Sequence, residues 1–151
     1  MELNGTATID APVDTVWRSL NDPEILRECI PGCEVMEKLS DTEWAASLVL
    51  NLGLFKPRFA GAVHLSDLDP PHAYTISAEG KGGMFGFAKG AADVSLAAQP
   101  EGKTLLTYAL RADVGGRIAQ LGARLVGSTA THLADLFFAR FGEVIRQHAG
   151  S

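Results

Sequence analysis

The chain has 151 residues, 46% of them hydrophobic and 21% charged, which is the composition of an ordinary globular protein and predicts a single domain over residues 1–151. Its formal net charge of −5 disfavours a nucleic-acid partner, because binding to phosphates needs a basic surface. The sequence has neither a signal-peptide pattern nor an apolar run of about 18 residues, so we expect a cytoplasmic protein.

The first thirty residues predict a strand followed by two short helices. Residues 3–9 are rich in Thr and aliphatic side chains, which is typical of a strand. Residues 13–20 place their apolar side chains on one helical face. In the next segment Asp22 can cap a helix, and Pro23 fits its first position, where no N–H is needed. The Pro-Gly pair at 31–32 ends this second helix, because Pro cannot continue the hydrogen-bond ladder.

The middle of the chain predicts a series of strands. Apolar and polar side chains alternate through it, which is the pattern of a sheet with one face on a core. In the fourth strand, for example, Val63 is expected to face inward and His64 outward. The expected strands cover residues 34–39, 42–52, 56–66, 74–78, 92–96 and 106–112.

Residues 79–90, with the sequence EGKGGMFGFAKG, combine many glycines with the large apolar side chains Met84, Phe85 and Phe87. The stretch lacks the glycine spacing of a dinucleotide-binding loop, and it precedes a strand instead of a helix. We interpret it as a flexible hairpin. Three roles stay open at this point: a gate at a cavity mouth, a contact with a membrane or partner, and packing onto its own core.

From Gly116 onward the hydrophobic period becomes that of a helix. Apolar residues recur every three or four positions from Ile118 to Val144, which predicts a helix of roughly 30 residues. At about 45 Å such a helix can lie across a whole sheet. Gly122 and Gly127 are expected inside it, where each costs roughly 1 kcal/mol relative to Ala. Small residues there either leave open volume or let the helix pack closer to the sheet.

Several short motifs occur in a fixed order along nearly the whole chain: AP at 11–12, VW at 16–17, NDPEILRECIPGCEV at 21–35, GFAKG at 86–90, and GG at 115–116 before AQLG at 119–122. Together they resemble the family of the carbon monoxide dehydrogenase subunit CoxG, within the SRPBCC superfamily, also called START or Bet v1-like. The resemblance implies an α+β helix-grip fold. In that fold a curved antiparallel sheet of about seven strands wraps a long C-terminal helix, and two short helices follow the first strand.

The space between sheet and helix is the ligand cavity of that superfamily, so the resemblance implies a ligand site there. We expect an apolar ligand such as a quinone or a lipid, because pockets of this kind are mostly apolar with a few placed polar groups. No cofactor of the protein's own is expected. The residues expected to line the site are Leu48, Leu50, Phe59, Val63, Tyr74, Ile76, Phe87, Tyr108, Leu110, Leu121, Gly122, Leu125 and Thr129.

The pattern gives little support to catalysis or metal binding. Cys29 and Cys33 have no further Cys and no nearby His, so we expect no metal site and interpret both as packed thiols, with a reversible disulfide as the alternative. No catalytic residue is predicted, because no nucleophile, base and orienting group can be combined by spacing. The alternative function is an enzyme of the polyketide cyclase or aromatase kind, with Tyr74, Tyr108 or His132 as acid–base groups.

The resemblance also implies partners. It points to an accessory role beside a molybdenum hydroxylase of the carbon monoxide dehydrogenase type, with membrane recruitment of that enzyme and passage of electrons to quinone as tasks. Some relatives carry a C-terminal extension that can anchor to a membrane, whereas this chain stops at residues 150–151. We therefore expect any peripheral contact with the inner face of the membrane to come from residues 84–87 or from a partner. An assembly chaperone, which works through surface contacts alone, is a further hypothesis.

Overall fold

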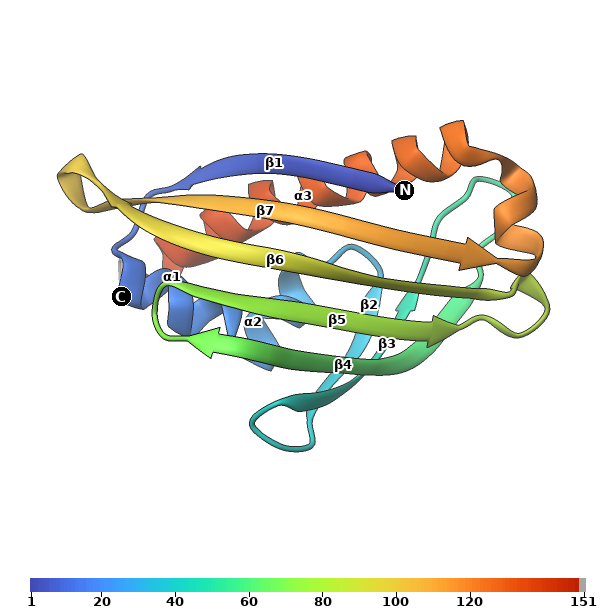
Figure 1. The fold of residues 1–151 in the computed structure, drawn as a ribbon, viewed down its shortest axis with the longest axis horizontal. Coiled ribbons are helices and arrows are strands. Elements are labelled where there is room, and N and C mark those ends of the chain that lie inside the picture. Colours follow the sequence, from blue (N-terminus) through green and yellow to red (C-terminus); the bar gives the residue numbers. More distant parts are fainter. Residues whose placement is uncertain (150–151) are drawn as a thin grey trace.

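The computed structural model describes residues 1–149, which form one curved antiparallel sheet packed against a long helix and two short ones (Figure 1). The architecture confirms the expected α+β helix-grip fold. The elements are β1 (Glu2–Ile9), α1 (Val13–Leu20), α2 (Pro23–Cys29), β2 (Cys33–Lys38), β3 (Glu43–Val49), β4 (Arg58–Asp69), β5 (Ala73–Lys81), η1 (Gly83–Phe85), β6 (Phe87–Gln99), η2 (Pro100–Gly102), β7 (Lys103–Gly115), η3 (Gly116–Leu121) and α3 (Ala123–Ala149).

The sheet has the strand order β1-β7-β6-β5-β4-β3-β2, with every neighbouring pair antiparallel. Its first strand therefore pairs with its last, and β2 and β1 form the two edges. Because paired residues of antiparallel strands share a face, the register assigns each side chain to one side of the sheet. One face, which we call the inner face, is turned toward the three helices (Figure 1).

The short helices form where the sequence predicts them, for the expected reasons. The Asp22 carboxylate accepts a hydrogen bond from the Glu24 backbone N–H at 3.0 Å, and Pro23 occupies the first turn of α2. α1 begins after Pro12 without a side-chain cap. The two helices bury their apolar sides against one end of the sheet and the C-terminal half of α3. The buried residues of α2 are Ile25, Leu26 and Cys29.

The long helix starts later than the hydrophobic period indicates, and this corrects one prediction. Residues 116–121 form η3, and α3 begins only at Ala123. Gly122 lies between them with a φ of +90°, a conformation that favours glycine. The expectation that Gly122 lies inside the helix is therefore wrong, whereas Gly127 does lie within α3.

The glycine-rich stretch is also more ordered than its composition indicates. β5 continues to Lys81 and β6 starts at Phe87, so only residues 82–86 form the connection. Gly86 has a φ of +102°, and a Cβ there would overlap the backbone of Gly115. Gly116 meets the backbone of Gly86 in the same way, and these two glycines let η1 and η3 approach each other backbone to backbone.

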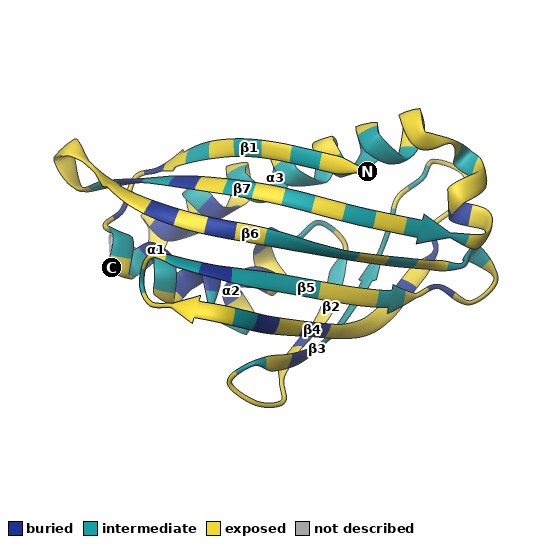
Figure 2. Ribbon diagram, in the orientation of Figure 1, coloured by how far each residue is buried: buried dark blue, intermediate teal, exposed yellow. Residues whose placement is uncertain are grey.

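The packed core occupies one half of the molecule, the half that contains α1 and α2 (Figure 2). The most completely buried large side chains there include Trp44, Phe141, Ile9, Leu106 and Ile145. We call this half the packed half. The other half, toward η1 and η3, is made largely of half-buried and exposed residues, and we call it the open half (Figure 2).

Candidate ligand-binding site

Ring contacts identify the side of the sheet that faces the helices. Tyr108 of β7 stacks on Phe138 of α3, with ring centroids 5.3 Å apart. Tyr74 of β5 meets Trp17 of α1 edge-on at 5.2 Å. Tyr74 and Tyr108 are both paired with Val94 of β6, so the three side chains form one row across the inner face.

Beyond this row the inner face continues with large side chains. Leu65, Ile76 and Leu110 lie in the next row, which passes through Ala92. Leu65 is fully buried, whereas Ile76 and Leu110 are only half-buried. The packing against the helices therefore begins to loosen here.

The following two rows are made mostly of alanine and glycine. The first runs Trp44, Val63, Ala78, Gly90, Ala112, and the second runs Ala46, Gly61, Gly80, Ala88, Val114. Seven of these ten residues are Ala or Gly. Ala78 and Gly61 are exposed, and the other five small residues are half-buried, although all of them belong to the face turned toward the helices. The inner wall of the open half thus carries few large side chains.

Trp44 and Tyr74 carry hydrogen-bond donors on the inner face. The indole Nε1 of Trp44, at one end of the first small-residue row, is buried and makes no hydrogen bond within residues 1–149. A buried N–H without an acceptor costs about 1–3 kcal/mol. Tyr74 is 5% exposed, and burial raises the pKa of its hydroxyl well above its ordinary value of 10. The phenol therefore stays protonated at neutral pH and can donate a hydrogen bond, but it cannot act as a base.

The two halves of helix α3 present different side chains to the inner face. Its C-terminal half presents Phe137 and Phe141, whose rings stack 5.5 Å apart, together with Ile145, which is 1% exposed. Its N-terminal half presents smaller or less buried residues such as Val126 and Ala130. In the open half both the sheet and the helix therefore present smaller or less buried side chains.

The structure brings seven of the expected site residues together on the inner face. These residues are Leu48, Phe59, Val63, Tyr74, Ile76, Tyr108 and Leu110.

The other six expected residues are placed differently. Leu50 follows the end of β3, Leu121 ends η3, and both are half-buried, as is Thr129 in α3. Gly122 is exposed and would meet nothing with an added Cβ, so it forms no wall. Leu125 is 45% exposed. Phe87 lies on the opposite face of the sheet, where its ring covers Gly115, because strand alternation places it opposite Ala88.

Three features of this wall were not predicted from the sequence. The unpaired N–H of Trp44 follows only from the complete packing. Phe138 is not one of the apolar residues that recur at helical spacing. Its stacking on Tyr108 depends on how α3 is rotated about its own axis. The pairing of small residues across β5, β6 and β7 depends on strand register. The frequent Ala and Gly in residues 60–92 predict small middle strands, but they do not say which of these residues share a row.

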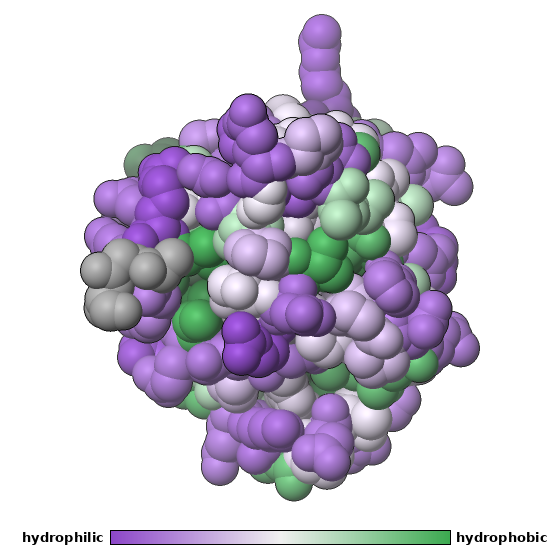
Figure 3. Space-filling model, turned by 90° about the vertical axis from the view of Figure 1, so that its left-hand side faces the viewer, coloured by the Kyte–Doolittle hydropathy of each residue, from purple (hydrophilic) through white to green (hydrophobic). Residues whose placement is uncertain are grey.

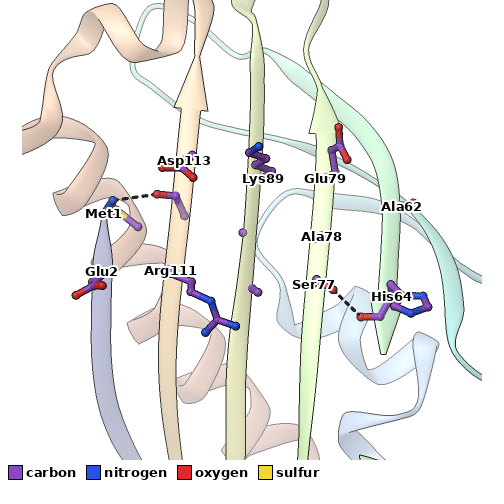
Figure 4. A pocket seen from close by; sticks show the side chains of 13 residues that line it. Met1, Glu2, Ala62, His64, Ser77, Ala78, Glu79, Lys89, Arg111 and Asp113 are labelled. Atoms are coloured by element: carbon purple, nitrogen blue, oxygen red, sulfur yellow. Dashed lines mark hydrogen bonds between the residues drawn. The ribbon is translucent and has the colours of Figure 1, made fainter. Parts of the chain in front are cut away.

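A hollow of about 590 Å³ lies on the outer face of the same sheet and differs in chemistry (Figure 4). Arg111, Lys89 and His64 project over it together with acidic side chains (Figure 4). Arg111 pairs with Asp93 at 3.0 Å, and both side chains are more than half exposed. Small residues, among them Ala78, Gly90 and Ala112, also line this hollow beneath the charged side chains. Because an apolar ligand favours apolar walls, we place the candidate site on the inner face, where these charged side chains do not lie.

The residues of the enzyme alternative do not form a catalytic group. His132 is exposed on α3, and Tyr74 packs edge-on against Trp17. Cys29 and Cys33 are free thiols. Burial raises the pKa of Cys29 to about 11 and also raises that of Cys33, so both thiols are poor nucleophiles at neutral pH.

Comparison with known proteins gives a family and several structural relatives. Residues 5–146 match the family model of the carbon monoxide dehydrogenase subunit CoxG. A conserved protein from Geobacillus kaustophilus is 31% identical, with a TM-score of 0.90 and coverage of 97% of this chain and 96% of that one. TTHA0849 from Thermus thermophilus is 19% identical, with a TM-score of 0.72 and full coverage of both chains. The Zhui aromatase/cyclase from Streptomyces sp. R1128 is 14% identical, with a TM-score of 0.70 and coverage of 99% and 95%. A search of curated proteins gives no significant match.

Proposed function

The chain belongs to the CoxG family of carbon monoxide dehydrogenase subunits, and we propose that it is a non-enzymatic binding protein for an apolar, quinone- or lipid-like molecule. In this proposal the molecule lies between the inner face of the sheet and the N-terminal half of α3. The protein acts as an accessory to a molybdenum hydroxylase of the carbon monoxide dehydrogenase type and links it to membrane quinone. It works in the cytoplasm, at the periphery of the membrane.

One observation carries the proposal: two rows of the inner wall are built mostly from Ala and Gly. Interiors of folded proteins are normally filled to crystal-like density, and the packed half of this molecule has that character. At Ala78 and Ala112 a Leu or Val side chain would bury more apolar surface than the methyl group of Ala does. An apolar ligand lying on Ala78, Gly90 and Ala112 would supply that burial.

The polar groups on the wall favour a ligand that carries carbonyl oxygens. Trp44 offers a buried N–H that has no acceptor, and Tyr74 offers a protonated hydroxyl. Both groups can donate to a carbonyl, whereas a plain hydrocarbon chain would leave the indole N–H unsatisfied. Within the apolar class, this chemistry supports a quinone over a simple acyl chain.

Replacing two small inner-face residues by larger ones tests the proposal. In the double variant Ala78→Leu/Ala112→Leu, two branched side chains occupy the row where the ligand would lie. The control is Ala62→Leu/Ala91→Leu, which makes the same changes on the outer face, in β4 and β6. Binding of decylubiquinone, followed by quenching of tryptophan fluorescence, should weaken at least tenfold in the inner-face variant and stay unchanged in the control. Equal affinity in the two variants would refute a site on the inner face.

The family relationship supports the accessory role, and a separate experiment tests it. A molybdenum hydroxylase of the organism should be retained on immobilised wild-type protein, because an accessory protein must contact its enzyme. If Ala78→Leu/Ala112→Leu still retains the hydroxylase although it no longer binds quinone, docking and ligand binding use different surfaces. If the wild type retains no hydroxylase, the accessory role is wrong.

The enzyme alternative has one observation in its favour, the shared fold with the Zhui aromatase/cyclase. At 14% identity this likeness concerns the fold alone. Tyr108 is the inner-face hydroxyl nearest to the small-residue rows on β7. The Tyr108→Phe variant should bind the quinone with nearly unchanged affinity in the proposed carrier. Turnover of a polyketide substrate that is lost in Tyr108→Phe would instead support the enzyme.

A further inference from the structure

The end of the open half carries a group of large apolar side chains that point into solvent. They come from two connections: residues 50–57, between β3 and β4, and residues 82–87, around η1. We call them the apolar tip, and its members are Leu54, Phe55, Met84 and Phe87, which are 96%, 53%, 71% and 41% exposed.

The apolar tip is one surface and not a set of unrelated loops. Phe55 contacts Phe85 with ring centroids 6.0 Å apart, which joins the first connection to η1. Gly86 and Gly116 approach each other backbone to backbone, which joins η1 to η3. In Figure 1 these three segments meet at the right-hand end of the molecule, opposite the turn at η2.

Positive charges predominate around the apolar tip, with the exposed carboxylates of Glu79 and Asp113 just beyond its segments. Residues 50–57, 80–88 and 114–134 contain no Asp or Glu, although the chain as a whole has a net charge of −5. Four exposed basic residues lie in these segments, and none of the ion pairs found within residues 1–149 involves them. They are Lys56, Lys81, Arg117 and Arg124.

At the opposite end carboxylates predominate, beside the basic residues Arg18 and Lys103. The connections at this end and the start of α1 carry five exposed carboxylates, none of which enters an ion pair within the described residues. They are Asp10, Asp14, Asp67, Asp69 and Glu101. Figure 3 looks at this end, where hydrophilic side chains cover most of the surface and surround a smaller hydrophobic area. A negative surface would attract the basic residues beside the apolar tip more than it would attract the acidic end.

We propose that the apolar tip and the basic residues around it form a docking surface for a bilayer that contains anionic lipids. Apolar side chains surrounded by Lys and Arg are the combination that binds such interfaces: the apolar groups enter the acyl boundary, and the cations contact lipid phosphates. None of the helices described here is long and apolar enough to cross a bilayer. A protein surface would need a matching acidic and apolar patch, whereas an anionic bilayer offers both properties everywhere.

The inference rests on the proposed function in one respect, the link to a membrane, and it gives that link a location. The small-residue rows lie in the same half of the molecule as the apolar tip. Docking by this end would therefore bring the candidate ligand site close to the bilayer, from which an apolar molecule could enter without crossing water.

Co-sedimentation with vesicles tests the inference. The wild-type chain should bind vesicles of phosphatidylcholine with phosphatidylserine, bind pure phosphatidylcholine vesicles much less, and dissociate as salt rises. Leu54→Ser/Met84→Ser should lower the partition coefficient at least tenfold, because two apolar groups no longer insert. Lys56→Gln/Lys81→Gln should lower it by about fivefold for each charge, on phosphatidylserine vesicles only. The control is Leu68→Ser, which removes a 43% exposed apolar side chain from the acidic end and should change nothing.

Each result distinguishes this inference from the proposed function. Absence of binding to phosphatidylserine vesicles overturns the docking surface. Binding that neither Leu54→Ser/Met84→Ser nor Lys56→Gln/Lys81→Gln weakens also overturns it. A dimer in solution that Leu54→Ser/Met84→Ser dissociates, without any vesicle binding, assigns the tip to a second copy of the chain and also overturns it. Quinone binding is measured in detergent on the same variants. It should persist in all of them, so failure of the ligand site would be seen separately.

Discussion

The two halves of this molecule use the same sheet for different purposes. In the packed half, strand residues such as Leu96 and Leu106 pack in one cluster with Phe141 and Ile145 of α3 and are almost completely buried. In the open half, the same strands present Ala and Gly to the helix. The packed half therefore provides most of the folding free energy, and the open half is free to hold a ligand and to expose apolar side chains. The comparison predicts that equal substitutions have unequal effects in the two halves.

The largest difference is expected between Phe141→Ala and Leu110→Ala. Phe141 is 0% exposed and stacks on Phe137, so truncation should lower the free energy of unfolding by about 3–5 kcal/mol. Leu110 is half-buried on the same inner face and borders the small-residue rows, so Leu110→Ala should cost about 1 kcal/mol. Urea unfolding followed by circular dichroism measures both values. Similar costs for the two variants would show that the open half is as tightly packed as the other.

The open half should depend on backbone contacts more than on side-chain packing. In Gly86→Ala the new methyl group would overlap the Gly115 backbone and occupy a φ of +102°, so we expect a loss of about 2–4 kcal/mol. Gly83→Ala is the matched control, because Gly83 also has a positive φ, of 57°, but a Cβ there meets nothing. Its cost should be about 1 kcal/mol. Equal losses would mean that η1 and η3 do not depend on close approach.

The sequence predicted the packed half better than the open half, and the reason is physical. Period-2 alternation identified Tyr74 and Tyr108 as inner residues, since large apolar side chains reveal which face is buried. The break at Gly122 was missed because the apolar period runs through it, and a positive φ leaves no trace in hydrophobicity. Phe87 was assigned to the ligand site because the glycine-rich stretch gave no register. The frequent Ala and Gly of the middle strands predicted small residues there, but only the strand register shows which of them form one wall.

Alkaline pH should weaken the packed half specifically, through Cys29 and Tyr74. Burial raises the pKa of Cys29 from 9.0 to about 11 and raises the pKa of Tyr74 further above its ordinary value of 10. In the unfolded chain these groups lose protons first, so the stability they confer is complete below about pH 9 and decreases as pH rises toward the folded-state values. For Cys29 the loss should be on the order of 2 kcal/mol by about pH 10.5.

The double variant Cys29→Ala/Tyr74→Phe removes both ionisations and tests this assignment. Its free energy of unfolding, measured in urea between about pH 8 and pH 10.5, should decrease less steeply than that of the wild type. Tyr74→Phe alone should be nearly neutral at pH 7, because the hydroxyl makes no hydrogen bond within residues 1–149 and the ring keeps its contact with Trp17. If the double variant lost stability with the same slope as the wild type, groups outside the packed half would control the alkaline transition. The contrast between the two halves would then hold for packing but not for ionisation.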